Sequence, residues 1–262
     1  MRIIFIRHGE PDYKTDSLTE KGFREAEILS ERVKTWNVKD FYVSPLGRAR
    51  ETAAPTLKKM GREAVTLEWM KEFSYMVHNP NYNEPHVPWD FIPSDWTSKP
   101  EMFDIKAWMD VSPMDSNPEI KKNYSIVTDN FDKLLEKYGY VRKDNYYIAL
   151  NRKERFVKGT SDHDLAIPFA DNYPESDSEP NIVIFCHLGV TCVVLSHLLN
   201  IPFQLLVHGF YLPPTSCTIL NSEERWGKDA YFRVQAMGDI HHLLSAGERP
   251  SNAGSFARTF AL

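Results

Sequence analysis

The chain has 262 residues, of which 42% are hydrophobic and 26% are charged. This length and composition are typical of a folded globular protein of one or two domains, and they exclude a disordered tail or a small disulfide-stapled module. Lys and Arg number 31 against 36 Asp and Glu, so the formal net charge is −5. That balance argues against a nucleic-acid partner or an anionic membrane surface, while a local basic site stays compatible with it.

Apolar segments and cysteines suggest where the protein resides. The most apolar stretch, 182–199, is interrupted by polar residues, so we interpret it as a buried strand followed by a helix. The apolar run at 3–6 is too short for the core of a signal peptide. Three cysteines in apolar contexts, which cannot all pair, indicate a reducing compartment: Cys186, Cys192 and Cys217. We therefore expect a cytoplasmic protein without a transmembrane helix.

Short β-branched runs alternate with helical patterns toward both ends of the chain, which is typical of a mostly parallel sheet with crossover helices. The expected strands are 3–6, 41–43, 65–67, 182–185, 218–220 and 231–234. The expected helices are 23–33, 48–60 and 190–199. Thr19 is suited to cap the first of these helices. The predicted fold is a three-layer α/β/α sandwich.

The middle of the chain has a different character. Residues 73–108 carry five prolines among many aromatic residues and show no sustained period. Because disorder requires low hydrophobicity, we expect an ordered cap packed on the core. A helix over 118–138, an extra strand over 146–150 and an acidic surface loop over 171–180 should follow. We thus predict a single domain, 1–262, with a cap inserted at about 73–181.

Arg, His and Gly recur together after three of the predicted strands. Residues 7–10 read Arg-His-Gly-Glu, residues 44–52 read Ser-Pro-Leu-Gly-Arg-Ala-Arg-Glu-Thr, and residues 187–189 read His-Leu-Gly. Open α/β sheets bind ligands at the carboxyl ends of their strands. An isolated Arg-His-Gly triplet is a weak signal, but the three segments together predict one site.

In this order the three segments resemble the histidine phosphatase superfamily, which includes the cofactor-dependent phosphoglycerate mutases. The resemblance covers about 1–72 and 182–243, and it implies a phosphoglycerate mutase-like fold. It makes His8 the nucleophile that becomes phosphorylated, with His187 as a further catalytic group. The phosphate-binding residues that it implies are Arg7, His8, Arg48, His187 and Leu188.

The resemblance also implies a carboxylic proton donor shortly after the third predicted strand. Glu72 is our assignment, and Glu68 is the competing one. We favour Glu72 because it lies farther past the end of the strand. The alternative for either residue is a solvated or salt-bridged carboxylate with no catalytic role.

Elementary chemistry supports these roles. Phosphoryl transfer needs positioning and cationic donors around the equatorial oxygens, which two guanidinium groups and a second histidine supply without a metal ion. Positive charge from Arg7 and Arg48 would lower the pKa of His8, keep its ring neutral and leave one nitrogen free to attack phosphorus. The resemblance implies that the other nitrogen bonds to a backbone carbonyl near the turn, where Gly9 allows a tight path. At Gly189, helix amides could add to anion binding.

Two departures from the family pattern shape the functional prediction. Mutases commonly continue from Arg-His-Gly to Ser and a Trp-Asn pair, whereas residues 10–13 here read Glu-Pro-Asp-Tyr, which favours a phosphatase. Many relatives have Gly-Gly after the late histidine, whereas here Leu188 places a side chain at the rim of the site. The segment 238–243 resembles a closing segment of family phosphatases, to which we assign a structural role.

We therefore expect a metal-independent phosphomonoester hydrolase that forms a phosphohistidine, with a small-molecule phosphomonoester as partner and no cofactor. A phosphomutase with the same pocket and a non-catalytic phosphate-binding module are the alternatives. Cys186, His187 and Cys192 do not make a convincing metal site, because neighbouring strand residues point apart. Four cap residues would each serve packing, and together they suggest an apolar or ring-bearing substrate: His78, His86, Trp89 and Trp96. A homodimer is compatible with the sequence.

Overall fold

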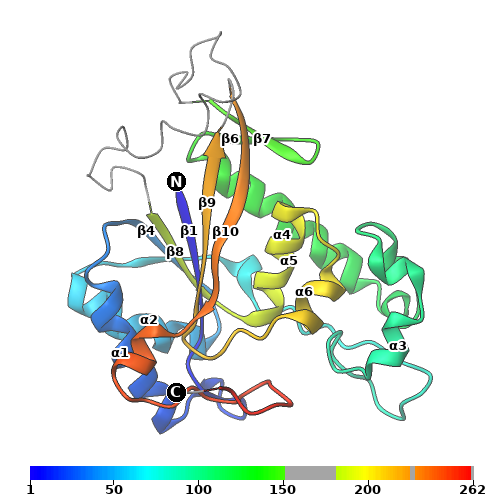
Figure 1. Ribbon diagram of the computed structural model, residues 1–262, viewed down its shortest axis with the longest axis horizontal. Coiled ribbons are helices and arrows are strands. Elements are labelled where there is room, and N and C mark those ends of the chain that lie inside the picture. Colours follow the sequence, from blue (N-terminus) through cyan, green and yellow to red (C-terminus); the bar gives the residue numbers. More distant parts are fainter. Residues whose placement is uncertain (151–180, 225–227, 261–262) are drawn as a thin grey trace.

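The computed structural model describes residues 1–150, 181–224 and 228–260. Within them the central sheet has eight strands in the order β5-β4-β8-β1-β9-β10-β7-β6 (Figure 1). The strands, in chain order, are β1 (Arg2–Arg7), β4 (Val38–Val43), β5 (Ala64–Thr66), β6 (Tyr140–Lys143), β7 (Tyr146–Ala149), β8 (Asn181–Cys186), β9 (Cys217–Glu224) and β10 (Asp229–Asp239). A separate two-stranded ribbon consists of β2 (Pro11–Asp12) and β3 (Ser17–Leu18).

One half of the sheet is parallel and the other half is antiparallel. Neighbouring strands among β5, β4, β8 and β1 pair in parallel. From β1 onward, β9, β10, β7 and β6 pair antiparallel. The predicted α/β/α sandwich is confirmed, and its central sheet is mixed. Its parallel strands are the ones after which the candidate site residues follow in the sequence.

Helices cover both faces of the sheet, because the inner strands are apolar on both sides. In β1, Ile4 and Ile6 face one apolar cluster, whereas Ile3 and Phe5 face the other. The first cluster lies under α1 (Glu20–Val33) and α2 (Gly47–Met60), and α7 (His241–Ser245) lies beside α1. The second lies under α4 (Glu119–Glu136), α5 (Leu188–Leu199) and α6 (Phe203–Gly209).

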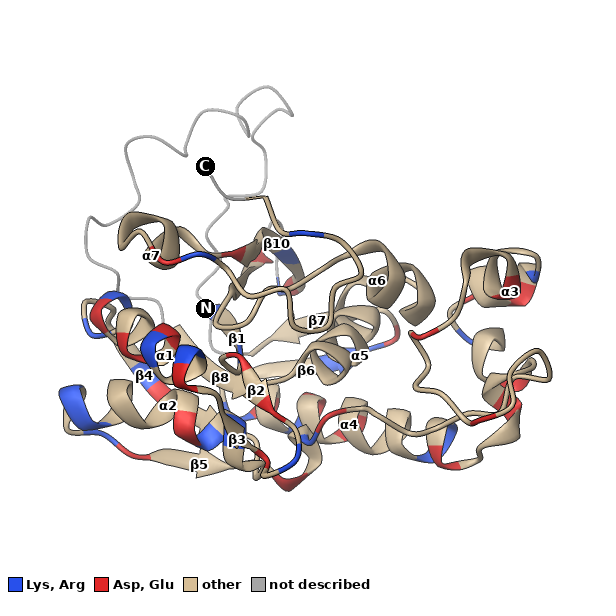
Figure 2. Ribbon diagram, turned by 90° about the horizontal axis from the view of Figure 1, so that it is seen from below, with Lys and Arg blue, Asp and Glu red and all other residues tan. Residues whose placement is uncertain are grey.

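Helix ends and burial follow from local sequence. The Thr19 side chain accepts a hydrogen bond from Gly22 N at 3.1 Å, which confirms the predicted N-cap of α1. α1 carries bands of acidic and basic residues on its outer side (Figure 2). α5 contains no Asp, Glu, Lys or Arg and is almost entirely buried, as expected of a helix that is apolar nearly all round. None of the helices in the described residues has the length and apolarity that crossing a bilayer requires.

Residues 73–118, called the cap below, pack on the α5 and α6 side of the sheet. Their regular structure is limited to one short α-helix and three single turns of 3-10 helix. These are α3 (Pro93–Thr97), η2 (Pro100–Phe103), η3 (Ala107–Asp110) and η4 (Met114–Ser116), and η1 (Glu68–Met70) precedes the cap. The side chains that join the core cluster are Phe73, Val77, Phe91, Met102, Trp108 and Met114.

The expected insertion over 73–181 is divided in the structure. α4 lies beside α5 as part of the sandwich, because its apolar residues recur at helical spacing and are buried. The predicted strand at 146–150 is β7, and it pairs with β6 and β10 at the far edge of the central sheet. The cap is therefore shorter than predicted. The expected loop at 171–180 lies outside the described residues.

Candidate active site

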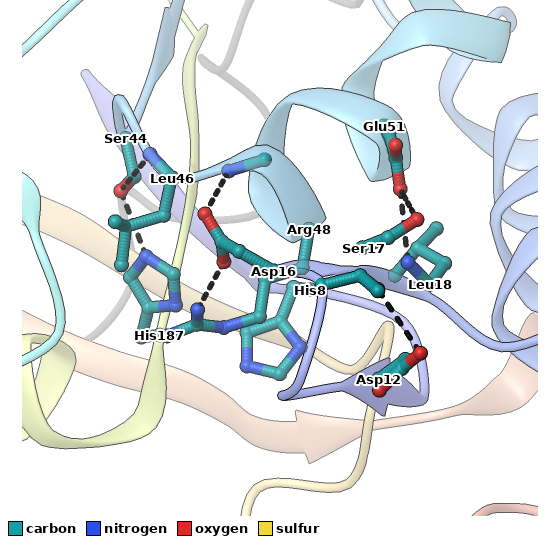
Figure 3. A network of polar contacts seen from close by, with 12 residues as sticks. His8, Asp12, Asp16, Ser17, Leu18, Ser44, Leu46, Arg48, Glu51 and His187 are labelled. Carbon is teal, nitrogen blue, oxygen red and sulfur yellow. Dashed lines mark hydrogen bonds and ion pairs between the residues drawn. The ribbon is translucent and has the colours of Figure 1, made fainter.

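The three sequence motifs meet at the carboxyl ends of neighbouring strands. Arg7 is the last residue of β1 and His8 follows it, Arg48 lies in the first turn of α2, and His187 joins β8 to α5. These four side chains are at most 8% exposed. The ring centroids of His8 and His187 lie 5.1 Å apart, with the Arg48 side chain beside them (Figure 3). The structure thus brings the predicted site residues together.

The ring of His8 has one defined orientation. Its Nδ1 lies 2.7 Å from Gly9 O, the kind of backbone acceptor that the family resemblance implied. Because a carbonyl oxygen only accepts, Nδ1 carries the proton and Nε2 of the neutral ring has a free lone pair. Burial lowers the pKa of His8 well below its usual value, and the charges of Arg7 and Arg48 lower it further. Near neutral pH, Nε2 is therefore unprotonated and has the lone pair that a nucleophile requires.

The turn that carries His8 is fixed by a residue of the second motif. Gly9 N donates to Thr52 Oγ1 at 2.9 Å, and Thr52 Oγ1 in turn donates to Arg48 O at 2.7 Å. A Cβ at Gly9 would lie 2.7 Å from Gly22 O of α1. Glycine is required here by this close approach of the helix. The threonine that ends the second motif therefore locks the first one in place.

Ser44, the first residue of the second motif, orients His187. Its Oγ lies 2.7 Å from His187 Nε2 and accepts from Leu46 N at 3.3 Å (Figure 3). The serine hydroxyl can donate to Nε2, and the ring proton of His187 then lies on Nδ1. Burial and the neighbouring His8, Arg48 and Arg7 lower the pKa of His187. A neutral ring that donates from Nδ1 is the result.

Arg48 is held by the ribbon of β2 and β3, a contact that the sequence did not predict. Asp16 bonds to Arg48 Nη1 through Oδ1 and accepts from Gly47 N through Oδ2 at 2.7 Å. The Tyr13 ring lies 5.4 Å from the Arg48 guanidinium and edge-on to His8 at 6.4 Å. Two-residue strands show no periodicity, so the positions of Asp16 and Tyr13 leave no signal in the sequence.

Arg7 is fixed by two backbone carbonyls from distant parts of the chain. Its Nη1 donates to Leu212 O and its Nη2 donates to Ala253 O at 2.9 Å. Thr215 N lies 3.1 Å from the carbonyls of both Arg7 and His8. The closing segment reaches this region through His242, whose Nε2 lies 3.2 Å from Thr215 Oγ1. These contacts fit the structural role expected of the segment.

Three donors of the site have no hydrogen-bond partner among the described residues. They are Arg7 Nε, Arg48 Nε and His187 Nδ1, and all three are buried. A buried donor without a partner costs roughly 1–3 kcal/mol, so natural proteins rarely keep one without a reason. A tetrahedral anion has enough acceptor oxygens to bond all three. Charge-assisted bonds from guanidinium groups would bind such an anion strongly.

Of the two candidate carboxylates, only Glu72 lies at the site. Its Oε1 accepts from Phe73 N at 2.8 Å and from Val190 N, in the first turn of α5, at 3.2 Å. Burial raises the pKa of Glu72, and it outweighs these two bonds and the nearby arginines, which lower the pKa. Glu68 is exposed and lies 3.6 Å from Lys71. Glu72 can therefore hold a proton close to the predicted phosphate residues.

The Leu188 side chain is placed differently from the expectation. It is 7% exposed and belongs to the apolar cluster between the sheet, α5 and the cap. What Leu188 can offer an anion is therefore its backbone amide in the first turn of α5, where helix amides face outward. Among the described residues, no group of three His, Cys, Asp or Glu side chains is arranged to hold a metal ion.

Comparison with known proteins agrees with this geometry. Residues 3–103 match the model of the histidine phosphatase superfamily, branch 1. The matched residues hold Arg7, His8, Arg48 and Glu72, and they make up less than half of the chain. A 2,3-bisphosphoglycerate-dependent phosphoglycerate mutase of Thermoplasma acidophilum is 37% identical over 73 residues, which are 24% of this chain and 36% of the mutase. The match thus spans little more than a third of that relative.

Solved structures of phosphatases share the fold. A mutant phosphoserine phosphatase from Entamoeba histolytica, in complex with phosphoserine, has a TM-score of 0.56 at 20% identity and covers 92% of this chain and 98% of its own. A mycobacterial glucosyl-3-phosphoglycerate phosphatase with VO3 scores 0.53 at 15% identity, covering 90% and 97%. The alpha-ribazole phosphatase of Shigella flexneri scores 0.52 at 17% identity, covering 91% and 96%. At these identities the likeness establishes the fold.

Proposed function

We propose that the protein is a phosphomonoester hydrolase that acts on a small-molecule phosphate through a phosphohistidine at His8, without a metal ion. The observation that carries this proposal is the set of three buried donors without partners, on Arg7, Arg48 and His187, beside the unprotonated Nε2 of His8. A phosphoryl group would bond to the donors and present phosphorus to the nucleophile. The same donors would stabilise the negative charge on its oxygens during transfer.

The reaction has two steps. In the first, Nε2 of His8 forms a bond to phosphorus while the bond from phosphorus to the ester oxygen breaks, and Glu72 gives its proton to the departing oxygen. In the second, the Glu72 carboxylate takes a proton from water as the water oxygen bonds to phosphorus. The phosphorus–nitrogen bond then breaks, which releases inorganic phosphate and restores His8.

The named neighbours support hydrolysis as the reaction class. Phosphatases for phosphoserine, glucosyl-3-phosphoglycerate and alpha-ribazole phosphate share this fold, and their substrates differ widely. The substrate of this chain is therefore not inferred from any one of them. A cytoplasmic location and a small-molecule partner stay part of the proposal.

A phosphomutase is the second candidate, because the sequence match of 37% identity is to a mutase. It would use the same nucleophile and donors but pass the phosphoryl group to a second substrate instead of water. The ribbon of β2 and β3 favours the hydrolase, since residues 10–13 lack the substrate-holding pattern of mutases and place Tyr13 over Arg48. Dependence on a bisphosphate primer, with slow release of phosphate, would favour the mutase instead.

The proposal is tested by hydrolysis of p-nitrophenyl phosphate and a panel of natural phosphomonoesters, with a chelator present throughout. Wild type should turn over, and His8→Ala should lose at least about 10⁴-fold in kcat, as when a nucleophile is removed from other enzymes. Glu72→Gln should lose much of the activity on substrates with poor leaving groups. Glu68→Gln is the matched control and should retain wild-type activity on these substrates.

Two results would overturn the proposal. Equal activity of His8→Ala and wild type would show that His8 is not the nucleophile. Binding of inorganic phosphate without turnover of any ester, with or without a bisphosphate primer, would indicate a non-catalytic phosphate-binding module.

A further inference from the structure

The cap brings Trp89 to the carboxyl group of Glu72. Both side chains approach Gly189, the second residue of α5, where a Cβ would lie 2.7 Å from Glu72 Oε1. The same Cβ would lie 2.7 Å from Cζ3 and 2.9 Å from Cη2 of the Trp89 indole. The carboxylate oxygen of Glu72 and the indole edge of Trp89 therefore both lie beside the Cα atom of Gly189. Both groups fit there because glycine has no side chain.

Trp89 belongs to a well-anchored turn of the cap. Before it, Val77 and His86 exchange two backbone hydrogen bonds of 2.8 and 2.9 Å. The neighbouring Pro88 is buried, and its carbonyl lies close to the His208 ring of α6. Trp89 itself is half-buried and packs against the core cluster. Its position over the start of α5 is thus fixed by the cap and by α6 together.

This inference rests on the proposed function, in which Glu72 protonates the departing ester oxygen. The leaving group must then lie next to Glu72, and so next to the indole of Trp89. We propose that Trp89 is a positioning and specificity-determining residue: it covers the Glu72 carboxyl group against water and forms an apolar wall for the leaving group. The substrates are then phosphomonoesters whose alcohol carries an aromatic or other apolar group. Such contacts favour a ring-bearing leaving group over a small polar one.

The electrostatic surroundings of Glu72 make the shielding measurable. Two arginines and two backbone amides favour its ionised form, yet burial raises its pKa on balance. Trp89 supplies part of that burial from the cap side, so its removal admits water and should lower the pKa of Glu72. The charged and titratable groups facing Glu72 are Arg7, Arg48, Cys186 and Cys192.

The first test compares Trp89→Leu with Trp36→Leu, a matched loss of indole on the opposite face of the sheet. The substrates are phenyl phosphate and glycerol phosphate. For Trp89→Leu, the ratio of kcat/KM for phenyl over glycerol phosphate should fall about tenfold, as expected from the loss of one aromatic contact and its buried area. The limb of the pH profile that reports Glu72 should move to lower pH. Trp36→Leu should leave the substrate ratio and the pH profile unchanged.

A second test does not depend on turnover. The side-chain carboxyl carbons of glutamate are titrated by ¹³C NMR, and the Glu72 signal is identified by its loss in Glu72→Gln. Glu72 should titrate at lower pH in Trp89→Leu than in wild type or Trp36→Leu. Trp89→Phe keeps a smaller ring, serves if Trp89→Leu does not fold, and should move both readouts by less.

The outcomes separate this inference from the proposed function. If wild type hydrolyses no phosphomonoester, the proposed function fails, whereas the titration still decides whether Trp89 shields Glu72. An unchanged titration in both Trp89 variants overturns the positioning role. An unchanged substrate ratio in an active enzyme overturns the specificity role.

Discussion

The strand ends and the cap contribute to the site by different physical means. At the strand ends, arginine and histidine side chains are buried and each is fixed by hydrogen bonds, as Arg7 is by two carbonyls and Arg48 by Asp16. The cap instead attaches through stacked rings, such as Trp108 on Phe203 at 5.0 Å. The strand ends thus supply fixed charge suited to a phosphoryl group, and the cap supplies apolar surface suited to what the phosphoryl group is attached to. Changes at the strand ends should affect all substrates alike, and changes in the cap should depend on the substrate.

After the loss of the His8 nucleophile, the largest effect should come from Arg48→Lys. Lysine keeps the charge but lacks the planar fork that bonds to Asp16 through Nη1 while its Nε has no partner among the described residues. We expect kcat/KM to fall by about 10²–10³-fold for every phosphomonoester, as when one donor to transition-state charge is lost. Arg50→Lys is the control, because Arg50 is exposed on the same helix. A loss confined to some substrates would show that the strand ends also select the leaving group.

The second effect is on stability and concerns Glu25, which lies beneath the His8 turn. It is fully buried, accepts from Glu10 N at 2.8 Å, and burial raises its pKa from 4.5 to about 7. Between these values the folded state binds more protons than the unfolded state, so stability falls as pH rises through the window. The total fall has a ceiling of about 3 kcal/mol.

The Glu25→Gln variant should remove this dependence, because the amide oxygen still accepts from Glu10 N and carries no charge. Its stability relative to wild type should therefore increase from pH 5 to pH 8, as measured by urea unfolding at both values. Glu20→Gln, an exposed change in the same helix, should show no comparable trend. A parallel pH dependence in wild type and Glu25→Gln would contradict the prediction.

The charged part of the site could be predicted because its signals are local. Each motif directly follows a strand, and parallel strands bring their carboxyl ends together wherever the intervening chain goes. The stretch 182–185 is apolar at every position, as a strand buried on both faces must be, and it lies inside the sheet between β4 and β1. Glu72 was preferred over Glu68 only by its distance from the strand end, and the structure places Glu72 at the site.

The remaining features depend on contacts between distant residues. Nothing near Arg7 in the sequence indicates that Leu212 and Ala253 hold its guanidinium group. In the cap, irregular backbone and single helical turns show no periodicity, so Trp89 could be named as a cap aromatic but not placed beside Glu72. β6 was missed for a related reason, since a four-residue strand of mixed polarity is too short to show a pattern.

Thr52 tests how tightly the two motifs are joined. Thr52→Val keeps the shape of the side chain but leaves Gly9 N buried without its acceptor. That loss should destabilise the protein by about 1–3 kcal/mol and lower kcat for all substrates, because the His8 turn shifts. Thr52→Ser keeps the hydroxyl group and should retain most of the stability and most of kcat. A larger loss of stability in Thr52→Ser than in Thr52→Val in urea unfolding would assign the role of Thr52 to packing of its methyl group instead.

The smallest predicted effect is in the cap, at Trp96. Its ring stacks on His208 at 4.7 Å, and the His208 ring lies close to the carbonyl of Pro88, so Trp96 reaches Trp89 only through two intermediate contacts. Trp96→Leu should loosen that support and lower kcat/KM for phenyl phosphate by about two- to fivefold, the size expected from one aromatic contact.

The turnover of glycerol phosphate by Trp96→Leu tests whether the strand ends and the cap have separate roles. Because the change leaves the strand-end donors in place, turnover of this small polar ester should be unaffected, and the ratio of the two substrates alone should move. An equal loss for both esters would mean that the cap also positions the phosphoryl group. The division between fixed charge at the strand ends and selective apolar surface in the cap would then fail, since a residue far from every donor would be controlling the chemistry common to all substrates.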